Sequence, residues 1–156
     1  MATRKFSDEP DKMFVHESQY SDVTETVSVK IKDFTQKISD LDNKQKPIVS
    51  PKLTIAGKML SICVIPELES SLEFISVNLR NCSKEIIKVT ANFKASCGEN
   101  RTMKNQEIPT CQWAGFKKFL SHAAFVKWAG ENKDIFSLEV KITLHTQSAA
   151  QWTTER

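Results

Sequence analysis

The sequence has little glycine, and none of it belongs to a motif that binds phosphate or activates a nucleophile. Only four glycines occur in 156 residues. Neither G-x-G-x-x-G nor G-x-x-x-x-G-K is present, which excludes the usual nucleotide cradles, and G-x-S-x-G is missing as well. The longest apolar windows, such as residues 60–65, fall far short of the roughly 18–20 residues that cross a bilayer. We therefore expect no cofactor, no membrane partner and no enzyme.

Metal-site spacing is missing too, although four cysteines are present. Cys63, Cys82, Cys97 and Cys111 are separated by 19, 15 and 14 residues, without a C-x-x-C pair or a histidine at ligand spacing. The opening residues lack the apolar core of a secretory signal, so reduced thiols are the default. The expectation is a cytoplasmic protein without a metal site.

Charge shows no strong excess of one sign. Lysine and arginine number 22 against 19 acids, and the basic residues are scattered along the chain. This balance argues against a nucleic-acid partner. Lysines on the outward side of residues 84–96 leave phosphate binding as an alternative, but we interpret them as solvated lysines that protect a sheet edge, which are commoner.

What the sequence does contain is a repeated alternation of apolar and polar residues, the period of a half-buried strand. It appears in 26–31, on both sides of Gly57 within 48–66, and in 72–80, 86–96 and 135–145. The last segment aligns Phe136, Leu138, Val140, Ile142 and Leu144 on one side. Short strands separated by turns predict an all-β fold, an antiparallel β-sandwich of about eight strands.

The alternation also divides the chain. Residues 1–22 are rich in charge and show no sustained period, so we interpret them as a flexible N-terminal extension. Residues 23–146 form the predicted sandwich domain, and the polar residues 147–156 form a flexible C-terminal tail.

The segment from 112 to 122, QWAGFKKFLSH, breaks the pattern. Its apolar residues fit an amphipathic helix, with Phe116, Phe119, Leu120 and Ala123 on one side. They also fit a short strand through Phe116 to Leu120, followed by one short helical turn near 121–126 that Ser121 would cap. We favour the strand because of a family resemblance.

Six segments of the sequence resemble the MATH domain, the β-sandwich shared by TNF receptor-associated factors (TRAFs) and meprins. They are VSVKIKDF at 27–34, SPKL at 50–53, ICVIP at 62–66, VNLRNCS at 77–83, GFKKFLSH at 115–122 and DIFSLEVKITL at 134–144. The resemblance covers about residues 27–145 in the family's order. It implies an interaction module that holds an extended peptide or a partner protein on the face or edge of the sandwich.

In that family the segment around GF-KF forms one side of a shallow peptide channel. The resemblance implies that Trp113, Phe116 and Lys117 border the channel, and the approximate alignment places Ser76 and Ala91 opposite them, where the family usually has aromatics. Here Ala114 separates the tryptophan from the glycine. A shift of one residue reverses the side on which a strand residue points, so it decides whether Trp113 reaches the channel.

Other interpretations stay open. The same sandwich could self-associate as a structural or scaffold protein, and Cys63, expected to point away from the core, would be a surface thiol or lie under a neighbouring subunit. His122 next to Ser121 would be the only base for a hydrolase, but we interpret it as a polar turn residue. Glu67 and Glu69 are expected to be exposed loop carboxylates, so no catalytic residue is predicted.

Overall fold

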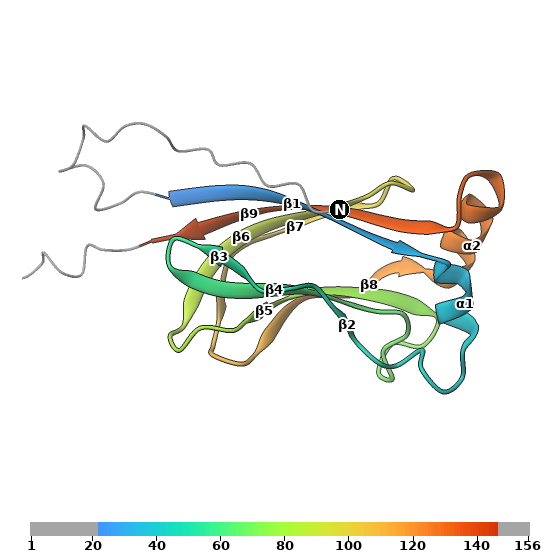
Figure 1. The fold of residues 1–156 in the computed structure, drawn as a ribbon, viewed down its shortest axis with the longest axis horizontal. Helices are drawn as coiled ribbons and strands as arrows, with labels where there is room; N and C mark the ends of the chain where they lie inside the picture. Colours follow the sequence, from blue (N-terminus) through green and yellow to red (C-terminus); the bar gives the residue numbers. More distant parts are fainter. Residues whose placement is uncertain (1–21, 147–156) are drawn as a thin grey trace, which may run out of the picture.

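The computed structural model describes residues 22–146 and divides their strands between two antiparallel sheets (Figure 1). Sheet A contains, in spatial order, β1 (Asp22–Lys32), β9 (Ile135–His145), β6 (Ile87–Ala95) and β7 (Asn100–Ile108). Sheet B contains, in spatial order, β2 (Ile48–Val49), β4 (Lys58–Ile65), β5 (Phe74–Asn81) and β8 (Trp113–Ser121), with β3 (Leu53–Ile55) also paired to β4. The prediction of an all-β antiparallel sandwich is confirmed.

The apolar side chains of the alternating strands fill the space between the two sheets. In β9, Phe136, Leu138, Val140, Ile142 and Leu144 are buried, whereas Glu139 and Lys141 are exposed. The adjacent strand β6 repeats this pattern. Each buried aliphatic or aromatic side chain stabilises the fold by roughly 1.5–3 kcal/mol relative to exposure. These inward rows are therefore the main force that holds the two sheets together.

Strand β7 is the strand of sheet A that the sequence pattern does not predict. It is an edge strand, and before Ile108 its inward side chains Arg101 and Met103 are only half-buried. A register shift opposite Val89 and Ala91, with Asn105 at a φ of 51°, interrupts the alternation further. An edge strand with a bulge and few apolar residues gives almost no period-two signal.

Two helices close one end of the sandwich in the described part of the chain (Figure 1). The helix α2 (His122–Glu131) begins where predicted, and the amide of Ala124 donates to the Ser121 hydroxyl at 3.1 Å. It runs for 10 residues rather than the single turn expected near 121–126. The short helix α1 (Phe34–Ser39) was not predicted, and its Phe34 packs against Phe125 of α2 and Phe136 of β9. This aromatic cluster explains why both helices lie at this end.

The first described strand begins one residue before the predicted start of the domain at residue 23. Asp22, which we assigned to the flexible extension, is the first residue of β1 and pairs with His145. The rest of that extension, 1–21, and the predicted tail, 147–156, lie outside the described residues.

Candidate functional site

The segment 113–121 is a strand, β8, and it occupies the edge of sheet B. Its only strand neighbour within residues 22–146 is β5, on one side. The edge strand of sheet A, β7, lies along the same side of the sandwich as β8 (Figure 1). The sandwich therefore has an open side bordered by two edge strands, and β8 carries three of the five predicted site residues.

Gly115 allows β8 to lie close against β5. A Cβ atom at this position would lie 2.0 Å from the carbonyl oxygen of Val77 and 2.6 Å from the Cα of Asn78. Real Cβ atoms do not approach backbone atoms so closely, so any other residue would push the two strands apart. The glycine of the GF-KF segment is thus explained by strand packing.

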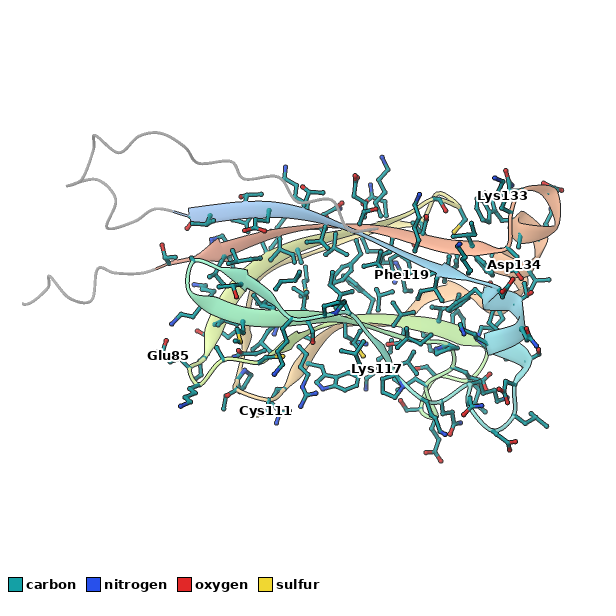
Figure 2. The ribbon with its side chains drawn as sticks, in the orientation of Figure 1. Glu85, Cys111, Lys117, Phe119, Lys133 and Asp134 are labelled. Carbon is teal, nitrogen blue, oxygen red and sulfur yellow. The ribbon has the colours of Figure 1, made fainter. Side chains whose placement is uncertain are left out.

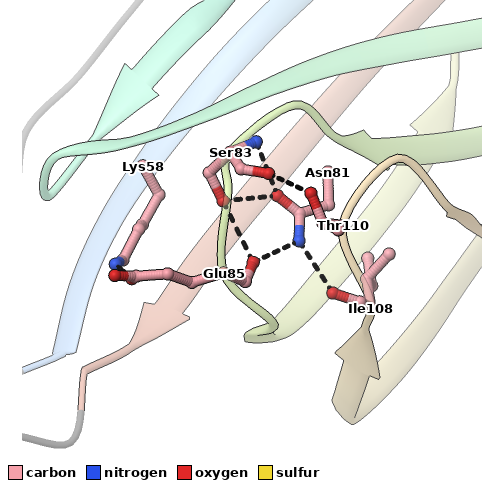
Figure 3. A network of polar contacts seen from close by, with 6 residues as sticks. All are labelled: Lys58, Asn81, Ser83, Glu85, Ile108 and Thr110. Atoms are coloured by element: carbon pink, nitrogen blue, oxygen red, sulfur yellow. Dashed lines mark hydrogen bonds and ion pairs between the residues drawn. The ribbon is translucent and has the colours of Figure 1, made fainter.

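A network around Asn81 fixes the start of β8 (Figure 3). The Asn81 side chain is fully buried, and its amide nitrogen donates to the carbonyl oxygens of Glu85 and Ile108 at 2.7 and 2.8 Å. Its amide oxygen accepts from the backbone N–H and the hydroxyl of Ser83 at 2.8 and 2.6 Å. The backbone of Asn81 bonds to Gln112 and Cys111. The turn that leads into β8 is therefore tied to the end of β5.

Phe116 lies on the inward side of β8, at the open side of the sandwich. It pairs with Val77, whose side chain is in the core. Its ring meets Phe93 edge-on, with the centroids 5.9 Å apart, and the guanidinium of Arg101 lies 5.8 Å from its centroid. The ring is only partly buried. Phe116 is thus a core residue whose remaining exposed part faces the gap between β7 and β8.

Trp113 and Lys117 lie on the opposite side of β8 from Phe116. Trp113 pairs with Arg80 and is 38% exposed, and Lys117 is exposed as well. In Figure 2, Lys117 points away from sheet A, whereas Phe119 points into the space between the sheets. The insertion of Ala114 therefore places the indole and the Phe116 ring on different sides of one strand.

The two remaining predicted residues are inaccessible. Ala91 lies in β6 with its methyl group in the core, and Ser76 lies in β5 on the side that faces away from sheet A. Both are fully buried. The five predicted residues therefore do not form one continuous surface, and only Trp113, Phe116 and Lys117 can touch a partner.

We define the outer face of sheet B as the side of β4, β5 and β8 that points away from sheet A. We restrict it to the nine residues that strand alternation and register place at its centre: Ser61, Cys63 and Ile65 of β4, Ser76, Asn78 and Arg80 of β5, and Trp113, Gly115 and Lys117 of β8. Met59, Phe74 and Ser121 lie on the same side at the strand ends, and the Lys118 ammonium lies over the Phe74 ring. Sequence reasoning did not single out Arg80 or Asn78. The sequence pattern of one strand does not show which residues lie beside a polar residue on the neighbouring strand.

Cys63 is not a surface thiol, which was one of the two interpretations left open. It does point away from the core, but it is fully buried beneath its neighbours on the outer face of sheet B, within a single chain. Burial raises the pKa of the Cys63 thiol to about 11, partly offset by the positive charge of Arg80 nearby. The thiol is therefore protonated and poorly nucleophilic at neutral pH.

Glu67 is not the exposed loop carboxylate that we expected, and His122 lies next to it. Glu67 is 5% exposed, forms a 2.7 Å ion pair with Lys44 and accepts a hydrogen bond from the Glu73 amide. The hydrogen bond from Lys44 holds its pKa below the usual range. His122 donates through Nε2 to the carbonyl oxygen of Pro66 at 2.5 Å, and its Nδ1 lies 3.7 Å from Glu67. These groups tie the loop after β4 to the start of α2.

Comparisons with known proteins add no family assignment. No family model matches the chain, and no curated protein matches it. The resemblance to the MATH domain accordingly stays a prediction.

Residues 22–146 contain no group of three or more His, Cys, Asp or Glu side chains placed to hold a metal ion. Neither described helix is long and apolar enough to cross a membrane. At the β8 edge the described surface carries an exposed aromatic side chain, Trp113, and an exposed basic one, Lys117.

Proposed function

We propose that this chain is a non-catalytic interaction module of the MATH and TRAF type that binds an extended peptide along β8. The observation that carries the proposal is the position of β8. It is an edge strand with exposed side chains on its outward side, a partly buried Phe116 on its inward side, and no further strand beside it within the described residues. Edge strands of this kind accept an added strand through main-chain hydrogen bonds, while alternate side chains provide specificity.

An added strand would meet different chemistry on its two sides. Its side chains on the inward side would approach Phe116 and Arg101, and those on the outward side would approach Trp113 and Lys117. Most exposed edge strands are protected by charge or a bulge against pairing with other chains. Here the lysines of β8 oppose pairing with unrelated strands but leave the indole of Trp113 accessible. This arrangement favours selective binding of a peptide that contacts the indole.

The proposal is tested with a displayed library of random linear peptides selected on the full chain. Selected peptides should lose affinity for Trp113→Ala and for Phe116→Leu, the second of which keeps the core filled. Lys141→Ala, on the far side of sheet A, serves as the control and should bind like the parent. A library that yields no ligand, or ligands that both β8 variants bind as well as the parent, would refute it.

Pairing of β8 with β8 of a second copy is the alternative that the same edge supports, and it would make the chain a self-associating scaffold. Light scattering at high concentration decides between the two, because a strictly monomeric mass removes the scaffold. We further propose a cytoplasmic location, since all four cysteines are free thiols, as is usual in a reducing compartment.

A further inference from the structure

The outer face of sheet B is positively charged. Its nine residues include two cations, Arg80 and Lys117, and no acid, although the chain contains 19 acidic residues. The other members are small or polar, apart from Ile65 and Trp113. The charge on this face is therefore uncompensated by any other residue of the same face.

Both cations also lack an acidic partner from elsewhere in residues 22–146. Other basic side chains find one: Lys58 pairs with Glu85, and Arg101 pairs with Glu99 at 2.9 Å. No ion pair joins Arg80 or Lys117 to a described carboxylate. Lys118, next to Lys117, has no ion pair with a described carboxylate either, so the basic charge of this part of β8 is not neutralised.

The side chain of Arg80 is partly buried and is not fully hydrogen-bonded. Its Nε is the one buried side-chain nitrogen or oxygen within the described residues that has no hydrogen-bond partner. The residue as a whole stays partly exposed, so the guanidinium is fixed at its base and open at its tip. Buried donors without an acceptor are rare in native proteins and call for a physical explanation. A fixed, planar guanidinium is well suited to bind a carboxylate, because little side-chain freedom is lost on binding.

Trp113 stands beside Arg80 on the neighbouring strand. The two are direct cross-strand partners on the same face, so their Cβ atoms lie within about 5 Å of each other. Arg80 is itself only partly exposed, and its Nε is buried. An ion pair formed at such a site is stronger than one made in open solvent.

We propose that the segment bound along β8 carries acidic residues on its outward side, at alternate positions, and apolar residues on its inward side. Because side chains alternate along a strand, every second residue of an added strand points to the same side as Trp113 and Lys117, with Arg80 one strand further into the sheet. The residues between them face Phe116 and the gap toward β7. This inference rests on the proposed function and specifies its ligand, an alternating acidic and apolar segment of a partner protein.

The test uses two fluorescein-labelled decapeptides, one alternating valine with glutamate and one alternating valine with glutamine, followed by fluorescence anisotropy with the full chain. The glutamate peptide should bind at least about tenfold more tightly, because a charge-assisted hydrogen bond is roughly twice as strong as a neutral one. Its affinity should fall as sodium chloride rises from about 50 to about 500 mM.

Four variants test which residues carry the acidic preference. Arg80→Gln and Lys117→Gln should each weaken binding of the glutamate peptide, and the double variant should bind both peptides alike. Lys141→Gln removes the same charge from sheet A and should behave as the parent. Arg80→Gln should also unfold at an unchanged urea concentration, since Nε has no partner to lose.

Distinct outcomes separate this inference from the proposed function. If the glutamine peptide binds as tightly as the glutamate peptide, strand addition at β8 stands and the acidic preference is overturned. An equal loss in Lys141→Gln would show a general charge effect and would overturn the preference as well. If neither peptide binds and the random library gives no ligand, both proposals fail.

Discussion

The Asn81 network allows a quantitative test of how the turn before β8 is held (Figure 3). Asn81→Ala removes four side-chain hydrogen bonds: two donated to the carbonyl oxygens of Glu85 and Ile108, and two accepted from Ser83. At roughly 1 kcal/mol for each bond, the variant should lose about 4 kcal/mol of unfolding free energy. That is a large share of the roughly 5–15 kcal/mol typical of a small domain.

The measurement is equilibrium unfolding in urea, monitored by circular dichroism. Asn100→Ala is the matched control, because Asn100 is exposed and accepts one hydrogen bond, from Asn92. It should cost less than about 1 kcal/mol. A loss below about 1.5 kcal/mol for Asn81→Ala would show that water replaces the network and that the turn is held by other contacts.

Two further predictions concern β8 and the loop after β4. Gly115→Ala should destabilise the fold by more than about 2 kcal/mol, because its methyl group would collide with the β5 backbone. Gly130→Ala in α2 is the control: its methyl group meets no atom within 4 Å, so the variant should be more stable by about 0.5–1 kcal/mol. Urea unfolding of both variants measures these changes, and equal effects would contradict the close approach of β8 to β5. The lowered pKa of Glu67 means that its contribution is complete above the usual glutamate value of 4.5 and is lost as pH falls through the lower, folded value. Glu67→Gln should therefore be less stable at pH 7 and lose less stability between pH 7 and pH 3, and parallel stability curves for variant and parent would refute that role.

The sequence predicts the parts of this fold in which apolar burial sets the pattern. Strands β9 and β6 have one side in the core, so their alternation appears directly in the sequence. Strand β7 and helix α1 were missed for the opposite reason. The strand buries little at the sheet edge, and the six-residue helix is stabilised by contacts of Phe34 with distant aromatic residues.

The candidate site was predictable only in part. Strand alternation correctly raised the possibility that Trp113 and Phe116 point to different sides of β8. The burial of Cys63 and Glu67 was not predictable, because it arises from residues on neighbouring strands and loops, namely Asn78 and Lys44. Arg80 stands out for lacking a hydrogen-bond partner at Nε, and that is a property of its surroundings rather than of the residue.

The pairing of β1 with β9 has a consequence for how the chain acquires its structure. These strands join along all 11 residues of each, and the contact of Asp22 with His145 spans 123 positions. Strand β9 also lies between β1 and β6. During synthesis β1 must wait until β9, its only strand neighbour within residues 22–146, has emerged. Such distant pairing favours slow folding, and it leaves the half-made chain dependent on protection from aggregation.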